Sequence, residues 1–149
     1  MEILGLPLHP LIIHAVVVLV PLAALGGIAI SVLTWARKRY GSLVVVGAFG
    51  AAVTTYVAQV AGQYLYNTKQ QRSAALEAHA AIGGQLLLWV ILLFVGTVVV
   101  MLAQRLIDLD QPRGRIALIS GAVITIAMAV VSTVQVMRIG HAGAVAVWG

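Results

Sequence analysis

Four long stretches of this 149-residue sequence contain no Asp, Glu, Lys or Arg. They run from Ile3 to Ala36, from Gly41 to Thr68, from Ala78 to Gln104 and from Ile116 to Met137. A helix that crosses the hydrocarbon core of a bilayer needs about 20 mainly apolar residues. Each stretch is long enough for one such helix and too short for two, so the sequence predicts four membrane-spanning helices.

The connections between the stretches are short, which leaves no room for a soluble domain. We therefore expect an all-α, four-helix up-down bundle that forms a single transmembrane domain over residues 1–149. The helices are predicted at about 11–35, 42–64, 80–104 and 116–137. Charged residues make up 9% of the chain, against about 25% in soluble domains, so a soluble globule is excluded. There is no Cys, which excludes disulfides, thiol nucleophiles and Cys-ligated metal sites.

The nine Lys and Arg residues predict how the bundle is oriented. Six lie in the first and third connections: Arg37, Lys38, Arg39, Arg105, Arg113 and Arg115. Three lie at the opposite end: Lys69, Arg72 and Arg138. Because basic loops stay on the cytoplasmic side, both termini are expected outside. These residues punctuate apolar runs and form no basic stripe, so no nucleic-acid partner is expected.

The four histidines are the most informative polar residues. His9 and His14 flank the start of the first predicted helix, with His9 expected as its N-cap before Pro10. His79 begins the third helix, and His141 follows the fourth. In an up-down bundle these positions share one end, the outer one. The sequence therefore predicts a one-sided His cluster contributed by three helices.

Neutral imidazole is a common metal ligand, and helix bundles bind cofactors between facing helices. A b-type haem held by two axial His is the preferred interpretation, with His14 and His79 as axial ligands and His9 and His141 as further ligands or supporting residues. Gly83, one turn after His79, is expected to leave room for the macrocycle. Lys69, Arg72 or Arg138 would meet its propionates. The expected role is electron transfer, or support of a respiratory or redox membrane complex.

Other interpretations remain open. All four His could serve as copper or zinc ligands facing the periplasm, or they could be structural histidines of a non-catalytic accessory subunit with no cofactor. No catalytic residue is predicted, and any activity is expected to be electron transfer at most. No charged residue lies inside the spans, which argues against an ion-coupled transporter.

Smaller features add further expectations. Pro21 should kink the first helix. Ala23 and Gly27 have helix-packing spacing, as do Gly47 with Ala51 and Ala58 with Gly62, and these pairs predict either packing within the bundle or a homo-oligomer face. Four glutamines in the spans could support the imidazoles or join helices: Gln59, Gln63, Gln85 and Gln135. Gln85 is expected below His79, and Gln135 below His141.

The chain also resembles a family of small bacterial membrane proteins catalogued as a domain of unknown function. The resemblance rests on Leu6-Pro7-Leu8-His9-Pro10-Leu11-Ile12-Ile13-His14, on His79, and on Gly140-His141-Ala142-Gly143-Ala144. It covers nearly the whole chain, and its N-terminal signature is Leu-Pro-Leu-His-Pro-x-x-x-His. It implies four transmembrane helices in a bacterial inner (cytoplasmic) membrane. Some relatives look fused to, or encoded beside, redox proteins, whereas many carry another residue where this chain has His141.

Overall fold

The computed structural model describes residues 2–3, 6–68 and 74–148. Four helices account for most of these residues: α1 (Leu8–Val32), α2 (Thr34–Thr68), α3 (Ala74–Asp108) and α4 (Gly114–Trp148). Two short antiparallel strands, β1 (Glu2–Ile3) and β2 (Leu6–Pro7), precede α1, with Glu2 opposite Pro7 and Ile3 opposite Leu6. The predicted all-α architecture is confirmed.

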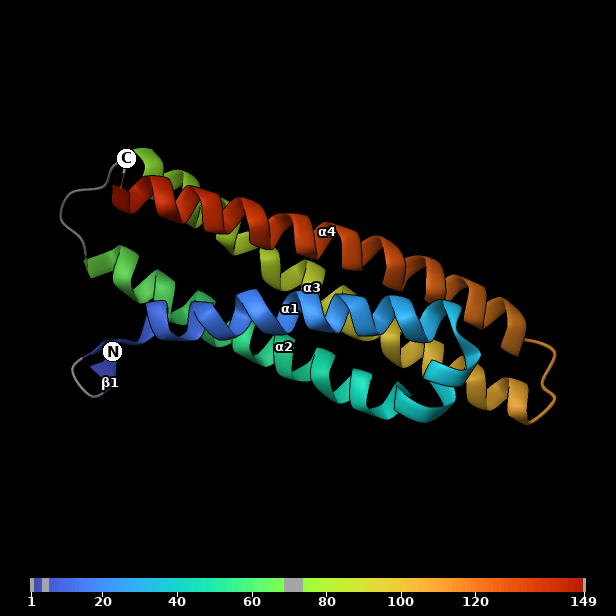
Figure 1. Cartoon of the computed structure of the whole chain (residues 1–149). Coiled ribbons are helices and arrows are strands. Elements are labelled where there is room, and N and C mark those ends of the chain that lie inside the picture. The colour runs from blue at the N-terminus through green and yellow to red at the C-terminus, as the bar shows by residue number, and fades with distance from the viewer. Residues whose placement is uncertain (1, 4–5, 69–73, 149) are drawn as a thin grey trace.

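The helices alternate in direction and form an up-down bundle (Figure 1). Each helix packs against its neighbours in sequence, and α4 also packs against α1, while α1 and α3 lie diagonally and touch little. The start of α1 and the end of α4 lie at the same end (Figure 1). All four helices are long and apolar enough to cross a membrane.

The predicted helix boundaries need correction at both ends of the bundle. The first connection is the single residue Leu33 and not a basic loop, since α1 ends at Val32 and α2 begins at Thr34. At the other end, α4 continues eleven residues past Met137, to Trp148. The length of an apolar stretch predicts only the part of a helix that lies inside the hydrocarbon core, which is about 30 Å thick. A 35-residue helix such as α4 is roughly 50 Å long and extends beyond that core. His9 lies within the first turn of α1 and is not its N-cap.

The connection between α3 and α4 is a tight turn built from backbone hydrogen bonds. The amide of Gln111 donates to the carbonyl of Leu106, and the amide of Asp110 donates to that of Ile107. This paired arrangement satisfies the last carbonyls of a helix. It requires left-handed backbone at Asp110, whose φ is 53°, and Asp tolerates this conformation better than most residues.

Small residues bring the helices close together in the middle of the bundle. A Cβ added at Gly96 of α3 would stand 2.5 Å from Oγ1 of Thr125 on α4, and one added at Gly121 would stand 3.1 Å from the backbone nitrogen of Val100. Gly27 of α1 contacts the same Thr125, where an added Cβ would lie 2.9 Å from Cγ2. The spacing of Ala23 and Gly27 therefore serves packing within the chain. Gly47, by contrast, faces open space.

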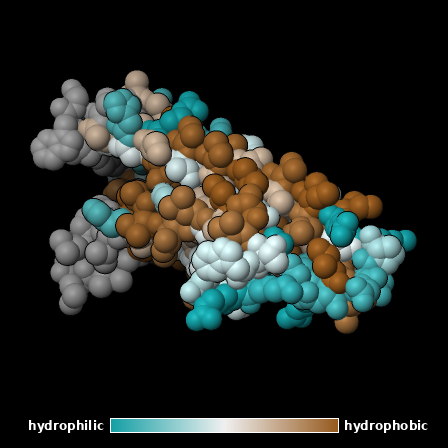
Figure 2. Space-filling model, turned by 45° about the vertical axis from the view of Figure 1, so that its right-hand side comes forward, coloured by the Kyte–Doolittle hydropathy of each residue, from teal (hydrophilic) through white to brown (hydrophobic). Residues whose placement is uncertain are grey.

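The surface reflects a membrane environment. Large apolar side chains are exposed along all four helices, including Leu22, Leu43, Leu88 and Ile119. Figure 2 shows hydrophobic residues over the middle of the bundle, a broad hydrophilic area at the end that carries the two short connections, and smaller hydrophilic areas at the other end. Buried hydroxyls are satisfied within their own helices, as where Thr97 donates to Phe94 and Thr125 donates to Gly121.

Candidate functional site

All four histidines lie at the end of the bundle where the chain starts and finishes. His9 and His14 are in the first two turns of α1, His79 is near the start of α3, and His141 is near the end of α4. Figure 1 shows these helix ends at one end of the bundle. Within that end the side chains differ, because His14 and His141 are exposed while His79 is partly buried. The side chain of His9 lies outside the described part of the chain.

Among the histidine side chains that the structure describes, that of His79 packs against a neighbouring helix. Its Nδ1 atom is buried, and its ring lies against Gly143 of α4, where an added Cβ would stand 3.3 Å from Cε1 and 3.4 Å from Nδ1. Leu86, two turns later on the same face of α3, is 5% exposed. The absence of a side chain at Gly143 therefore lets the imidazole approach the α4 backbone.

There is open space one turn along α3 from His79. A Cβ added at Gly83 would meet no heavy atom within 4 Å apart from the nearby backbone of its own helix. Gly140 of α4 also faces open space.

The residues around the histidines are arranged differently from the sequence expectation. Gln85 is exposed although His79 is partly buried, and Gln135 is buried although His141 is exposed. Both pairs are six residues apart, which places them on different faces of a helix that repeats every 3.6 residues. Gln135 instead accepts a hydrogen bond from exposed Arg138, with Nη1 to Oε1 at 3.4 Å.

Gln59 joins two helices at this end of the bundle. Its Nε2 donates to the carbonyl of Gly84 on α3 over 3.2 Å, while its Oε1 is buried. This contact favours the role of an interhelical link. Gln63 bonds within α2, to Asn67. Lys69 and Arg72, expected to meet haem propionates, lie outside the described residues.

A metal site built from several side chains is not formed in the described part of the chain. Among these residues, no three His, Cys, Asp or Glu side chains are grouped so that they could hold a metal ion. The described side chains of His14, His79 and His141 therefore do not form a three-ligand site. A site with one or two protein ligands does not require three such side chains to lie together.

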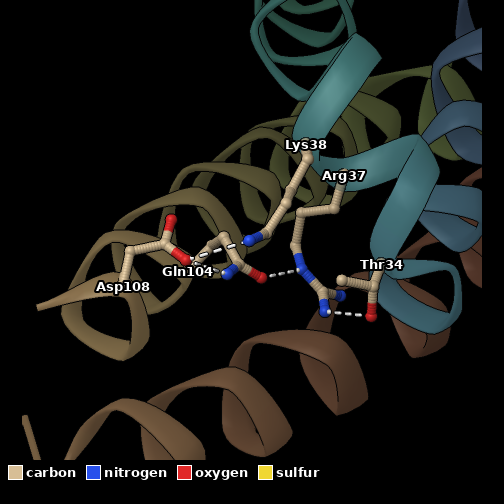
Figure 3. Close-up of polar contacts among 5 residues, drawn as sticks. All are labelled: Thr34, Arg37, Lys38, Gln104 and Asp108. Atoms are coloured by element: carbon tan, nitrogen blue, oxygen red, sulfur yellow. Dashed lines mark hydrogen bonds and ion pairs between the residues drawn. The ribbon is translucent and has the colours of Figure 1, made fainter. Parts of the chain in front are cut away.

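The opposite end holds a polar network that the sequence did not predict (Figure 3). Arg37 of α2 is 5% exposed. Its Nε donates to Oε1 of Gln104 on α3 over 2.7 Å, and its Nη1 donates to the carbonyls of Ile30 at 2.7 Å and Ser31 at 3.1 Å. Its Nη2 donates to Oγ1 of Thr34 over 3.2 Å.

The network continues to the end of α3. Nε2 of Gln104 donates to Oδ1 of Asp108 over 2.9 Å, and Nζ of Lys38 lies 3.2 Å from the same oxygen. Arg37 thus satisfies carbonyls at the end of α1 and joins them to α3, which explains how the chain reverses at Leu33 without a loop. In the sequence, Arg37 cannot be distinguished from Lys38 and Arg39, because all three charges indicate membrane topology equally.

Comparison with known proteins gives the family and no closer relative. The family model described as a predicted membrane protein (DUF2231) matches residues 5–149. No curated protein and no solved structure matches the chain. Since the matched region covers nearly the whole sequence, the chain belongs to the DUF2231 family of predicted membrane proteins.

Proposed function

We propose that this protein is a membrane-embedded haem-binding protein that serves electron transfer, with its site at the histidine-bearing end of the bundle. The observation that carries the proposal is the position of His79, partly buried between α3 and α4.

The surroundings of His79 suit one axial ligand of a b-type haem. Its Nδ1 is buried on the side of α4, so Nε2 is the ring nitrogen that would bind the iron. The open space at Gly83, one turn after His79 on α3, supports the proposal, because no other helix in the described part of the chain lies within 4 Å of the position of an added Cβ. When bound, a b-type haem supplies a one-electron redox couple.

The second axial ligand is proposed to come from α1. Because α1 and α3 lie diagonally in the bundle, ligands from these two helices would approach a bound group from opposite sides. His14 and His9 are the candidates, and His14 is exposed in the structure. As the second ligand, His14 would hold the haem from the α1 side of the bundle. Arg138, which is exposed at this end of the bundle, would form an ion pair with a haem propionate.

Among the described side chains, the number of ligands required favours haem over zinc. Structural zinc takes four ligands and catalytic zinc takes three from the protein, and the described residues offer no group of three. The proposed redox partner is a respiratory or other redox complex in the same membrane. The proposed membrane is the bacterial inner membrane, with the histidine-bearing end outside.

The test is a reduced-minus-oxidised absorption spectrum of the protein purified from haem-supplied cells. We expect Soret and alpha bands, lost in His79→Gly and restored when imidazole is added to that variant. Restoration by imidazole distinguishes a lost ligand from a lost fold. His9→Ala and His14→Ala identify the second ligand, and Gln63→Ala, an exposed polar change on α2 at the same end, serves as the matched control. Absence of the bands from the parent protein would overturn the proposal.

A structural role for the histidines is the competing function, and the packing of His79 against Gly143 is the observation in its favour. In that case His79→Ala lowers the unfolding temperature of a colourless protein. Metal analysis of the same sample tests for copper or zinc.

A further inference from the structure

The three consecutive basic residues Arg37, Lys38 and Arg39 have three different environments. The guanidinium of Arg37 is buried and bonded to α1 and α3. The ammonium group of Lys38 is paired with Asp108. Arg39 is exposed, and no carboxylate of the described residues lies within ion-pair distance of it. Of the three charges, the one on Arg39 is therefore left for a partner outside the chain.

Arg39 is held in place by an aromatic side chain. Its guanidinium carbon lies 5.7 Å from the centre of the Tyr40 ring, and its Nε donates to Oη of Tyr40 over 3.3 Å. Trp35 meets Tyr40 edge to face, with ring centres 6.0 Å apart and an interplanar angle of 80°. Within the described part of the chain, Nη1 and Nη2 of Arg39 make no hydrogen bond. Nη1 and Nη2 of Arg39 therefore remain as hydrogen-bond donors on a side chain whose position is held by Tyr40.

The surroundings of Trp35, Arg39 and Tyr40 indicate that they face the lipid. Trp35 is 62% exposed and Tyr40 is 43% exposed. The exposed apolar residues Leu33 and Leu43 lie two residues before Trp35 and three residues after Tyr40. The group therefore adjoins the lipid-facing surface at the end of the bundle that has the broad hydrophilic area (Figure 2). Trp and Tyr concentrate at this boundary between hydrocarbon and headgroups.

We propose that Trp35, Arg39 and Tyr40 form a binding site for the headgroup phosphate of an anionic phospholipid. The planar guanidinium matches phosphate oxygens, and its two terminal nitrogens can bind them in a bidentate manner. The aromatic rings lie at the level of the glycerol and upper acyl chain. Exposed Arg105, Arg113 and Arg115 lie on the helix ends and turn at the same end of the bundle and add positive potential. This site is separate from the histidine-bearing end and does not depend on the proposed haem.

The experiment uses the fluorescence of Trp35 in the full chain. Trp89→Phe and Trp148→Phe leave Trp35 as the one tryptophan, since the sequence has three. The protein is reconstituted into phosphatidylcholine vesicles containing equal small fractions of brominated phosphatidylglycerol or brominated phosphatidylcholine. Bromine quenches a nearby indole, so the degree of quenching reports which lipid occupies the site.

We expect brominated phosphatidylglycerol to occupy the site about fivefold more than brominated phosphatidylcholine, the preference that one basic residue confers at a membrane surface. Arg39→Gln should abolish this preference. Lys38→Gln, the matched control, removes the same charge from the adjacent residue and should retain it. Equal quenching by the two lipids in the parent, or equal effects of the two variants, would overturn the proposal. An unchanged Trp35 emission maximum and elution volume in Arg39→Gln verify that the variant is folded.

Discussion

The side chain of Arg37 donates a 2.7 Å hydrogen bond to the side-chain carbonyl of Gln104, joining residues that are 67 positions apart. The same guanidinium donates hydrogen bonds to carbonyls in the last turn of α1. Arg37 therefore holds the turn between α1 and α2 against α3. It sits where a single residue, Leu33, separates the two helices.

Arg37→Met should destabilise the protein. The substitution leaves the backbone carbonyls of Ile30 and Ser31 and the side-chain carbonyl of Gln104 without their donor. The loss of buried hydrogen bonds to a charged group costs about 2–3 kcal/mol. The free energy of unfolding, measured by SDS titration in neutral detergent micelles, provides the check. Arg39→Met, an exposed matched control, should change it by less than about 0.5 kcal/mol. Equal losses in the two variants would contradict the structural role of Arg37.

Gly96→Ala should separate α3 from α4. The added methyl group would stand 2.5 Å from Oγ1 of Thr125 and 3.1 Å from backbone atoms of the same residue. Overpacking of this kind costs about 1–3 kcal/mol. Gly47→Ala, where nothing lies within 4 Å, should instead stabilise the helix by about 0.5–1 kcal/mol. Unfolding temperatures of the two variants should therefore move in opposite directions, and a shared direction counts against this packing.

Gly143→Ala should displace the ring of His79 whether or not a cofactor is bound. Its methyl carbon would lie 3.3 Å from Cε1, closer than most such contacts, so the imidazole has to shift. The Cε1–H resonance of His79, assigned by its loss in His79→Gln, should move in Gly143→Ala. It should stay in place in Gly140→Ala, because position 140 faces open space. A resonance that is insensitive to both changes would mean that α4 does not contact His79.

Membrane orientation can be measured cleanly because the chain has no Cys. Single cysteines at Gln111, in the turn between α3 and α4, and at Asn67, near the end of α2, report the two ends of the bundle. With the termini outside, a membrane-impermeant maleimide should label Asn67→Cys in intact cells. Gln111→Cys should be labelled only after the cells are permeabilised. The opposite pattern would reverse the orientation that the basic residues predict.

The sequence was sufficient for the number of helices and their alternation. Charge-free length is a direct requirement of the bilayer, and four such lengths with short connections leave few arrangements. That requirement also placed His9, His14, His79 and His141 at one end, since it depends only on which helix terminus each residue occupies. The exact ends of the helices could not be predicted from the sequence, because a helix continues beyond the hydrocarbon core wherever its backbone hydrogen bonds continue.

Only the tertiary structure decided which way each polar side chain faces. In a soluble helix the polar face is visible as a period in the sequence, but lipid-facing residues here are as apolar as buried ones, as exposed Leu22 and buried Val20 illustrate. The sequence therefore could not separate partly buried His79 from exposed His14 and His141. Nor could it assign the roles of Arg37, Lys38 and Arg39, which depend on α1 and α3 packing beside them. Helix rotation is determined by close packing at residues such as Gly96 and Gly143, and packing is a property of the assembled bundle.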